Sequence, residues 1–271
     1  MQGTHGASGQ PPTFVISMPQ AVERREAAKR QLERLGLAFS FFDGVVGRDL
    51  SDETVAQVYD AAGNRRRWKQ PLARAEIGCY LSHIGVWKMV RDAGHAWALV
   101  LEDDFEADPE LVDVAQRLSA MQLGPSLVKL DHFKSGWAKQ LEDFGGGRRL
   151  TRPWIASGLT TGYMVNAAGA ASLAAAAVPF ARPVDCDIKH WWEFGVEILA
   201  IQPPIVRPRQ GATSSIDAGR KAERAQAPLA RLLKNIAYQT NLQFGSASAR
   251  FTGRFLGGGS GTVRRSRRRT S

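Results

Sequence analysis

The stretch most informative about the fold is Ala96-Trp97-Ala98-Leu99-Val100-Leu101-Glu102-Asp103-Asp104. Its six apolar residues predict a short buried strand, which ends abruptly in three carboxylates. In open α/β sheets, ligands collect at the carboxyl ends of strands. Adjacent carboxylates repel one another unless a cation relieves the repulsion, and Mg²⁺ and Mn²⁺ prefer oxygen ligands and bridge to phosphates. The stretch therefore predicts a divalent-cation site, with an acidic loop that caps the next helix as the alternative.

Strands and helices alternate on both sides of this stretch, which predicts an α/β sandwich with a mainly parallel sheet. Residues 63–71 contain Arg65-Arg66-Arg67 and are expected to form a mobile loop, and a Gly-rich connection is expected at 145–147. The expected strands cover residues 14–18, 38–42, 96–101, 127–130, 163–165 and 197–201, and the expected helices cover residues 21–35, 51–62, 76–90, 109–121, 167–177 and 187–194.

Charge divides the chain into a near-neutral part and a strongly basic end. The net charge is +10, yet residues 1–217 hold 24 basic and 25 acidic residues, a net of −1. Residues 218–271 hold 12 basic residues and a single acid, Glu223, a net of +11. We therefore expect a disordered N-terminus over residues 1–12, a catalytic domain over 13–217, and a basic, partly helical and partly disordered tail over 218–271.

Two features of the sequence indicate the cellular compartment of the protein. The N-terminus shows no basic patch followed by an apolar segment, and no run approaches the roughly 20 apolar residues that cross a bilayer. Cys79 and Cys186 are the only cysteines, which fits a reducing environment and rules out a four-cysteine zinc site. We therefore expect a cytoplasmic protein.

Several motifs, in order, resemble glycosyltransferase family 25, the lipopolysaccharide and lipooligosaccharide sugar transferases. The most specific is Glu76-Ile77-Gly78-Cys79-Tyr80-Leu81-Ser82-His83, and the resemblance covers roughly residues 13–217. It implies a GT-A-like, Rossmann-type fold, a nucleotide-sugar donor, UDP-linked or related, and inverting transfer of a hexose such as galactose to a surface glycan. The other motifs that carry it are Phe14-Val15-Ile16-Ser17-Met18 with Glu23-Arg24-Arg25, Val100-Leu101-Glu102-Asp103-Asp104, Pro183-Val184-Asp185, Pro203-Pro204-Ile205-Val206 and Ser214-Ser215-Ile216.

In such an enzyme a cation, Mn²⁺ or Mg²⁺, offsets the charge that builds on the departing diphosphate. We assign Asp104 as the direct metal ligand, Glu102 as its support, and Asp103 as a weaker ligand or a contact to the nucleotide ribose.

The remaining donor contacts are expected from the first strand and two helices. Ser17, Arg24 and Arg25 follow the first strand, where arginine suits phosphate; the two arginines alternatively form a solvated helix face. Glu76 and His83 lie on one face of the same helix. We expect this face to point toward the donor; alternatively, it packs in the core.

An inverting transferase also needs a base that takes the acceptor proton. Asp185 is the leading candidate, followed by Asp187 and Asp131. Alternatively, Asp185 and Asp187 cap the helix that begins near Ile188.

The basic end carries an apolar stripe from Leu229 to Ala237 and arginines between 264 and 269. This pattern suits attachment to an anionic membrane, here the inner face of the inner membrane, where a glycolipid acceptor would lie. Alternatively, the helix packs on the domain and the arginines are solvated.

Two other functions stay open. One is nucleic-acid binding through the tail, without any recognised motif, and the other is a metal-dependent phosphoesterase or nucleotidyltransferase that uses the same carboxylates.

Overall fold

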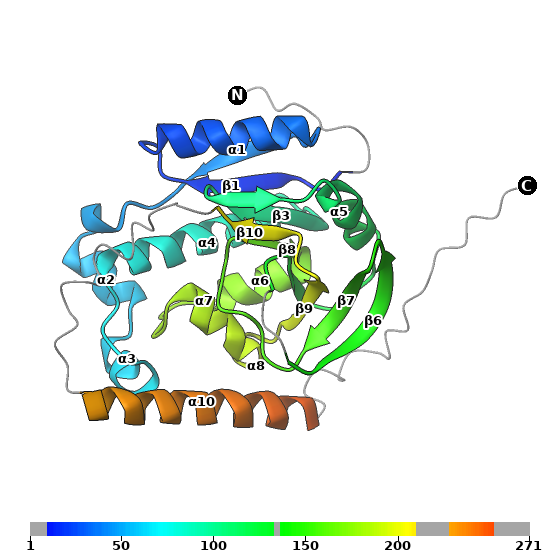
Figure 1. The fold of residues 1–271 in the computed structure, drawn as a ribbon. Coiled ribbons are helices and arrows are strands. Elements are labelled where there is room, and N and C mark those ends of the chain that lie inside the picture. Colours follow the sequence, from blue (N-terminus) through cyan, green and yellow to red (C-terminus); the bar gives the residue numbers. More distant parts are fainter. Residues whose placement is uncertain (1–9, 133–135, 210–227, 252–271) are drawn as a thin grey trace, which may run out of the picture.

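The computed structural model describes residues 10–132, 136–209 and 228–251. Its centre is an eight-stranded sheet of order β2-β1-β3-β8-β5-β9-β7-β6, in which β8 and β7 run against the other six strands (Figure 1). A short pair, β4 with β10, lies apart from it. The strands are β1 (Thr13–Ser17), β2 (Phe39–Asp43), β3 (Trp97–Glu102), β4 (Phe105–Ala107), β5 (Ser126–Lys129), β6 (Ala138–Gly145), β7 (Arg148–Pro153), β8 (Gly162–Asn166), β9 (Glu197–Gln202) and β10 (Val206–Pro208).

Helices cover both faces of this sheet, with α1 and α5 on one side and α4, α6, α7 and α8 on the other (Figure 1). The predicted α/β sandwich with a mainly parallel sheet is confirmed. The helices are α1 (Val22–Arg34), η1 (Gly47–Asp49), α2 (Asp52–Val58), α3 (Ala61–Arg67), α4 (Arg74–Asp92), α5 (Leu111–Ser119), α6 (Ala167–Ala176), α7 (Val184–Asp187), η2 (Ile188–His190), α8 (Trp191–Phe194) and α10 (Pro228–Phe251).

The apolar run of β3 is buried on both faces of the sheet. Leu99 and Leu101 pack into the core beneath α1 and α5, whereas Ala98 and Val100 pack into the core beneath α4 and α6. Side chains alternate along a strand, so a central strand covered on both sides needs apolar residues at every position. This explains why β3 has no polar alternation before Glu102.

The segment predicted as a loop at residues 63–71 is instead helical as far as Arg67. Helix α3 begins after Asp60, whose carboxylate accepts a hydrogen bond from the Gly63 amide at 2.7 Å. The buried Asn64 side chain donates to the Ala181 carbonyl at 2.9 Å. This cap and this tertiary contact hold the arginine-bearing helix, which the loop prediction overlooked.

Strands β6 and β7 form a hairpin where only a Gly-rich connection was expected. Gly145, Gly146 and Gly147 all have positive φ angles, which supply the turn. Strand β6 is largely exposed and carries two irregularities in its pairing with β7. The regular apolar alternation by which a strand is recognised is therefore missing from its sequence.

Helix α10 packs against the sandwich, below α3 and α8 in Figure 1. Tyr238 and Leu242 are buried, and the Ser246 hydroxyl donates to the Trp154 carbonyl at 2.8 Å. The side chains of residues 229, 232, 233 and 237 in the predicted apolar stripe lie outside the described residues, whereas Ile236 is 53% exposed. None of the described helices has the length and apolar character that a bilayer crossing demands.

Candidate active site

A cleft of about 890 Å³ opens at the carboxyl ends of β1 and β3. Its walls come from the end of β1, the start of α1, residues 44–48, the start of α4 and the acidic triplet. Parallel strands place their carboxyl ends at one edge of the sheet, which is why residues so distant in sequence meet here. Six of the predicted site residues line the cleft: Ser17, Arg24, His83, Glu102, Asp103 and Asp104.

One wall of the cleft depends on close contact between the loop after β2 and helix α4. A Cβ atom on Gly78 would lie 2.5 Å from the Val45 carbonyl oxygen, and one on Gly47 would overlap the Arg74 carbonyl. The Val45 amide also donates to the Ser82 hydroxyl at 2.8 Å. The glycine of the Glu76–His83 motif thus lets the loop backbone rest directly on the helix.

The first acid of the triplet, Glu102, turns toward α4 and β8. Its Oε1 lies 3.4 Å from His83 Nε2 and accepts a hydrogen bond from Thr160 Oγ1 at 2.5 Å. Burial alone would raise the pKa of Glu102, but His83 and Thr160 bring it below its usual value. Glu102 is therefore ionised at neutral pH and held in place.

The second acid, Asp103, turns toward β1 and α1. The Ser17 hydroxyl donates to Asp103 Oδ2 at 2.6 Å, and Arg24 Nη1 lies 3.1 Å from Asp103 Oδ1. Burial raises the pKa of Asp103, which Ser17 and Arg24 oppose. Asp103 thus joins two of the predicted donor contacts into one hydrogen-bonded group at the cleft wall.

The third acid, Asp104, keeps a free ligand atom. Its Oδ1 is buried and has no hydrogen-bond partner among the described residues. Burial, followed by the charges of Glu102 and Asp103, raises the pKa of Asp104 to about 6. A buried carboxylate oxygen with a raised pKa beside two other acids fits a hard divalent cation, which would supply the missing positive charge.

Arg25 and Glu76, two other predicted donor contacts, do not line the cleft. Arg25 contacts the Asp43 carboxylate and donates to the Ser17 carbonyl at 2.9 Å, so it supports the end of β1. Glu76 is 3% exposed and accepts a hydrogen bond from the Ala73 amide at 2.8 Å, at the start of α4. Both contacts stabilise the backbone around the cleft.

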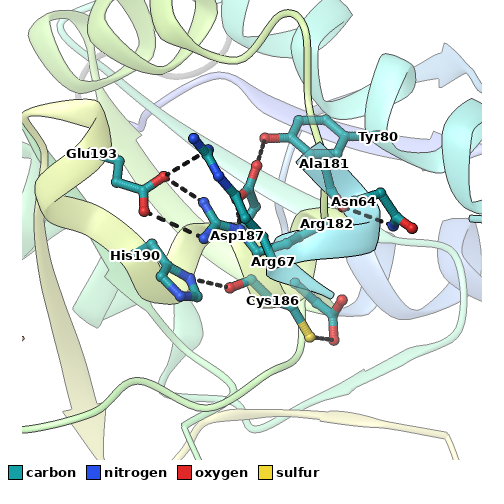
Figure 2. Close-up of polar contacts among 10 residues, drawn as sticks. Asn64, Arg67, Tyr80, Ala181, Arg182, Cys186, Asp187, His190 and Glu193 are labelled. Carbon is teal, nitrogen blue, oxygen red and sulfur yellow. Dashed lines mark hydrogen bonds and ion pairs between the residues drawn. The ribbon is translucent and has the colours of Figure 1, made fainter. Parts of the chain in front are cut away.

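Two of the three candidate bases have buried cationic partners. Asp131 lies 3.0 Å from Lys129 Nζ, and both side chains are fully buried. Figure 2 shows the Asp187 carboxylate between Tyr80 and Arg182: the Tyr80 hydroxyl donates to it at 2.7 Å and Arg182 forms an ion pair with it. These partners occupy the carboxylate oxygens that a base would need.

The third candidate, Asp185, is half-buried on α7 and lies beside Gly158. Its carboxylate is near enough to contribute to the raised pKa of the Cys79 thiol, of which burial is the larger cause. Burial also raises the pKa of Asp185 itself, against the effect of Lys189. Asp185 thus differs from Asp131 and Asp187 in being half-buried rather than fully buried.

Some site residues were not singled out from the sequence. Thr160 was not among the predicted site residues, although its hydroxyl holds Glu102. Cys79 was not predicted as a ligand, yet its sulfur lies within 4.8 Å of the ligand atoms of His83 and Glu102. The spacing of four residues between Cys79 and His83 places both on one helix face, and that signal was available.

Comparison with known proteins adds the family. Residues 10–144, which include all the residues that line the cleft, match the sequence profile of glycosyltransferase family 25 (LPS biosynthesis protein). Procollagen galactosyltransferase 1-B of Xenopus laevis is 31% identical over 121 residues, 44% of this chain and 19% of that protein. Procollagen galactosyltransferase 2 of Homo sapiens is 28% identical over 181 residues, 64% of this chain and 29% of that protein. The chain therefore spans less than a third of the length of these curated relatives.

A solved structure also shares features with this chain. It is described as a glycosyltransferase involved in the glycosylation of the major capsid of PBCV-1. It is 12% identical, with a TM-score of 0.29, over 59% of this chain and 61% of that one.

Proposed function

The chain belongs to glycosyltransferase family 25, and we propose that it transfers a hexose from a nucleotide sugar to a glycan acceptor. The observation that carries this proposal is the cleft at the ends of β1 and β3, where Asp103, joined to Ser17 and Arg24, adjoins the free carboxylate oxygen of Asp104. The cleft lies wholly within the residues that match the family. The names of two curated relatives, both procollagen galactosyltransferases, favour galactose as the transferred sugar. A UDP-linked donor is part of the same proposal.

The donor's nucleotide would lie against the ends of β1 and β3. The Arg24 guanidinium is about one-third exposed at the cleft and presents unused donors to a diphosphate. Asp103 is available to a ribose hydroxyl, because its charge is already balanced by Arg24. These contacts would bind the donor without any movement of the sheet.

Asp104, with Glu102 behind it, would hold Mn²⁺ or Mg²⁺. The buried, unpartnered Oδ1 of Asp104 fits this role. When bound, such a cation offsets negative charge on the leaving diphosphate. Arg24 would contribute to the same end.

The acceptor would be activated by Asp185, with inversion at the anomeric carbon. Asp131 and Asp187 have buried cationic partners. Asp185 is half-buried beside Gly158, and the Lys189 ammonium lies at the same glycine. Its raised pKa strengthens it as a proton acceptor. Asp185→Asn should lower turnover on the order of 100-fold and leave donor affinity unchanged.

We also propose a membrane-associated acceptor, such as a lipopolysaccharide precursor, at an anionic leaflet. Ile236, Phe244 and Phe251 are exposed apolar residues on α10, and Phe244 is 72% exposed. Six arginines follow this helix in the sequence between residues 254 and 269. Apolar side chains next to a polybasic segment are the combination that binds anionic lipid surfaces.

The test of the transferase activity is a screen of nucleotide sugars with and without Mn²⁺. Released nucleoside diphosphate is measured, and NMR of the product reports its anomeric configuration. The proposal expects a UDP-hexose to be turned over with the metal and not without it. If no nucleotide sugar is hydrolysed or transferred under any metal condition, the proposal is wrong.

A further inference from the structure

One acid of the triplet, Glu102, converges with a thiol and an imidazole from helix α4. We propose that Cys79, His83 and Glu102 form a second cation site, which takes a borderline transition metal such as Zn²⁺ rather than Mg²⁺ or Mn²⁺. The ligand atoms of the three residues all lie within 4.8 Å of one another, and within the described residues no other group of three or more does so. Asp104 is not a member of this group.

The geometry between two of the ligands already suits a tetrahedral metal. His83 Nε2 and Glu102 Oε1 are 3.4 Å apart. Two ligand atoms that each lie about 2.0–2.1 Å from a Zn²⁺ ion at the tetrahedral angle are separated by about 3.3–3.4 Å. A cation can thus enter between them with little change in either side chain. Cys79 lies one helical turn before His83 on α4, so its sulfur reaches the same point.

The His83 ring is buried, and its Nε2 faces Glu102 Oε1 at 3.4 Å. The ring is 0% exposed, and Nε2 has no hydrogen-bond partner among the described residues. Nδ1 lies 2.9 Å from the Tyr163 hydroxyl, which also accepts a hydrogen bond from Trp87 Nε1 at 2.9 Å. Buried polar nitrogens normally find partners. With a metal on Nε2, the ring proton would lie on Nδ1, which would donate a hydrogen bond to the Tyr163 hydroxyl. A hydrogen bond from the second ring nitrogen is usual for a histidine that binds a metal.

The ligand types decide which cation binds. A thiolate and an imidazole prefer Zn²⁺, Co²⁺ and similar ions, whereas Mg²⁺ and Mn²⁺ prefer oxygen. Binding converts the Cys79 thiol to a thiolate and releases its proton to solvent. Three protein ligands leave a fourth position, and since all three residues line the cleft, that position faces the cleft. This inference does not depend on the proposed transfer reaction.

Cobalt substitution tests the site without any activity measurement. Co²⁺ is added to metal-free protein, and absorption is recorded together with equilibrium dialysis. We expect one Co²⁺ per chain with a thiolate-to-cobalt band in the near ultraviolet and intense visible bands of four-coordinate Co²⁺, all displaced by Zn²⁺. Excess Mg²⁺ should leave them in place.

Single substitutions identify the residues that bind Co²⁺. Cys79→Ser should abolish the near-ultraviolet band, and His83→Gln should weaken Co²⁺ binding by tenfold or more. Cys186→Ser removes the other cysteine and Asp104→Asn removes the proposed donor-metal ligand; both should keep the full spectrum. Circular dichroism of the metal-free variants verifies folding, and Cys79→Ser is the least disruptive change. If wild-type protein binds no Co²⁺, or if the band survives in Cys79→Ser, the proposal is overturned and His83 is simply a partner of Glu102.

Discussion

Replacing Asp187 by Asn should destabilise the protein rather than disable its chemistry. Asp187 is 3% exposed, and its partner Arg182 is 4% exposed. Burial would lower the pKa of Arg182, but Asp187 and Glu193 raise it above its usual value. Removing one partner of a buried ion pair costs about 3–5 kcal/mol, because the other charge stays buried. Arg182 keeps Glu193, so we expect the lower end, about 3 kcal/mol.

The assay is thermal unfolding followed by circular dichroism. For a domain of this size, 3 kcal/mol corresponds to a fall in Tm of about 6–12 °C. Asp185→Asn is the matched control: it lies two residues away on the same short helix, and its Tm should change far less, while its turnover falls. An Asp187→Asn variant with unchanged Tm and a large loss of turnover would refute this reasoning and make Asp187 the base.

Three further predictions concern other parts of the molecule. Burial, and then Arg182, lowers the pKa of His190 to about 4, so between about pH 6.5 and 4 the unfolded state binds more protons. Stability should fall by up to about 3 kcal/mol as pH decreases through this window, and urea midpoints for His190→Gln should show a smaller fall. Gly78→Ala should separate the 44–47 loop from α4 and weaken donor binding in calorimetry; unchanged affinity would mean that this wall takes no part. Deletion of residues 255–271 should reduce co-sedimentation with anionic liposomes but spare transfer to a soluble acceptor, whereas equal sedimentation would remove the membrane role.

The central elements of the fold could be predicted because their patterns are local. Val100 and its neighbours form an unbroken apolar run, and α4 repeats apolar residues at helical spacing. The exposed hairpin β6–β7 carries no such pattern, and α3 depends on contacts with Ala181, more than one hundred residues away. Such tertiary contacts cannot be inferred from a window of sequence.

The candidate site could be predicted only in part, for a related reason. The resemblance to glycosyltransferase family 25 is confirmed, and the acidic triplet does line a cleft. We expected Glu102 to support the metal ligand Asp104, but the surroundings of the two acids differ. Glu102 contacts His83 and Thr160, whereas Asp104 Oδ1 has no hydrogen-bond partner among the described residues. The ion pair between Arg182 and Asp187 was not foreseen either, because the four intervening residues give no sign that both side chains are buried. The assignment of the individual roles stays a prediction.

The most direct test of the account is calorimetry of UDP-galactose binding in the presence of Mn²⁺. The compared proteins are the wild type, Asp104→Asn and Glu106→Gln, the last as a control for loss of a nearby carboxylate. The account predicts that Asp104→Asn weakens binding by at least tenfold, about 1.4 kcal/mol, whereas Glu106→Gln binds as the wild type does. Equal affinity of all three proteins would contradict the claim that Asp104 holds the metal of a nucleotide-sugar site.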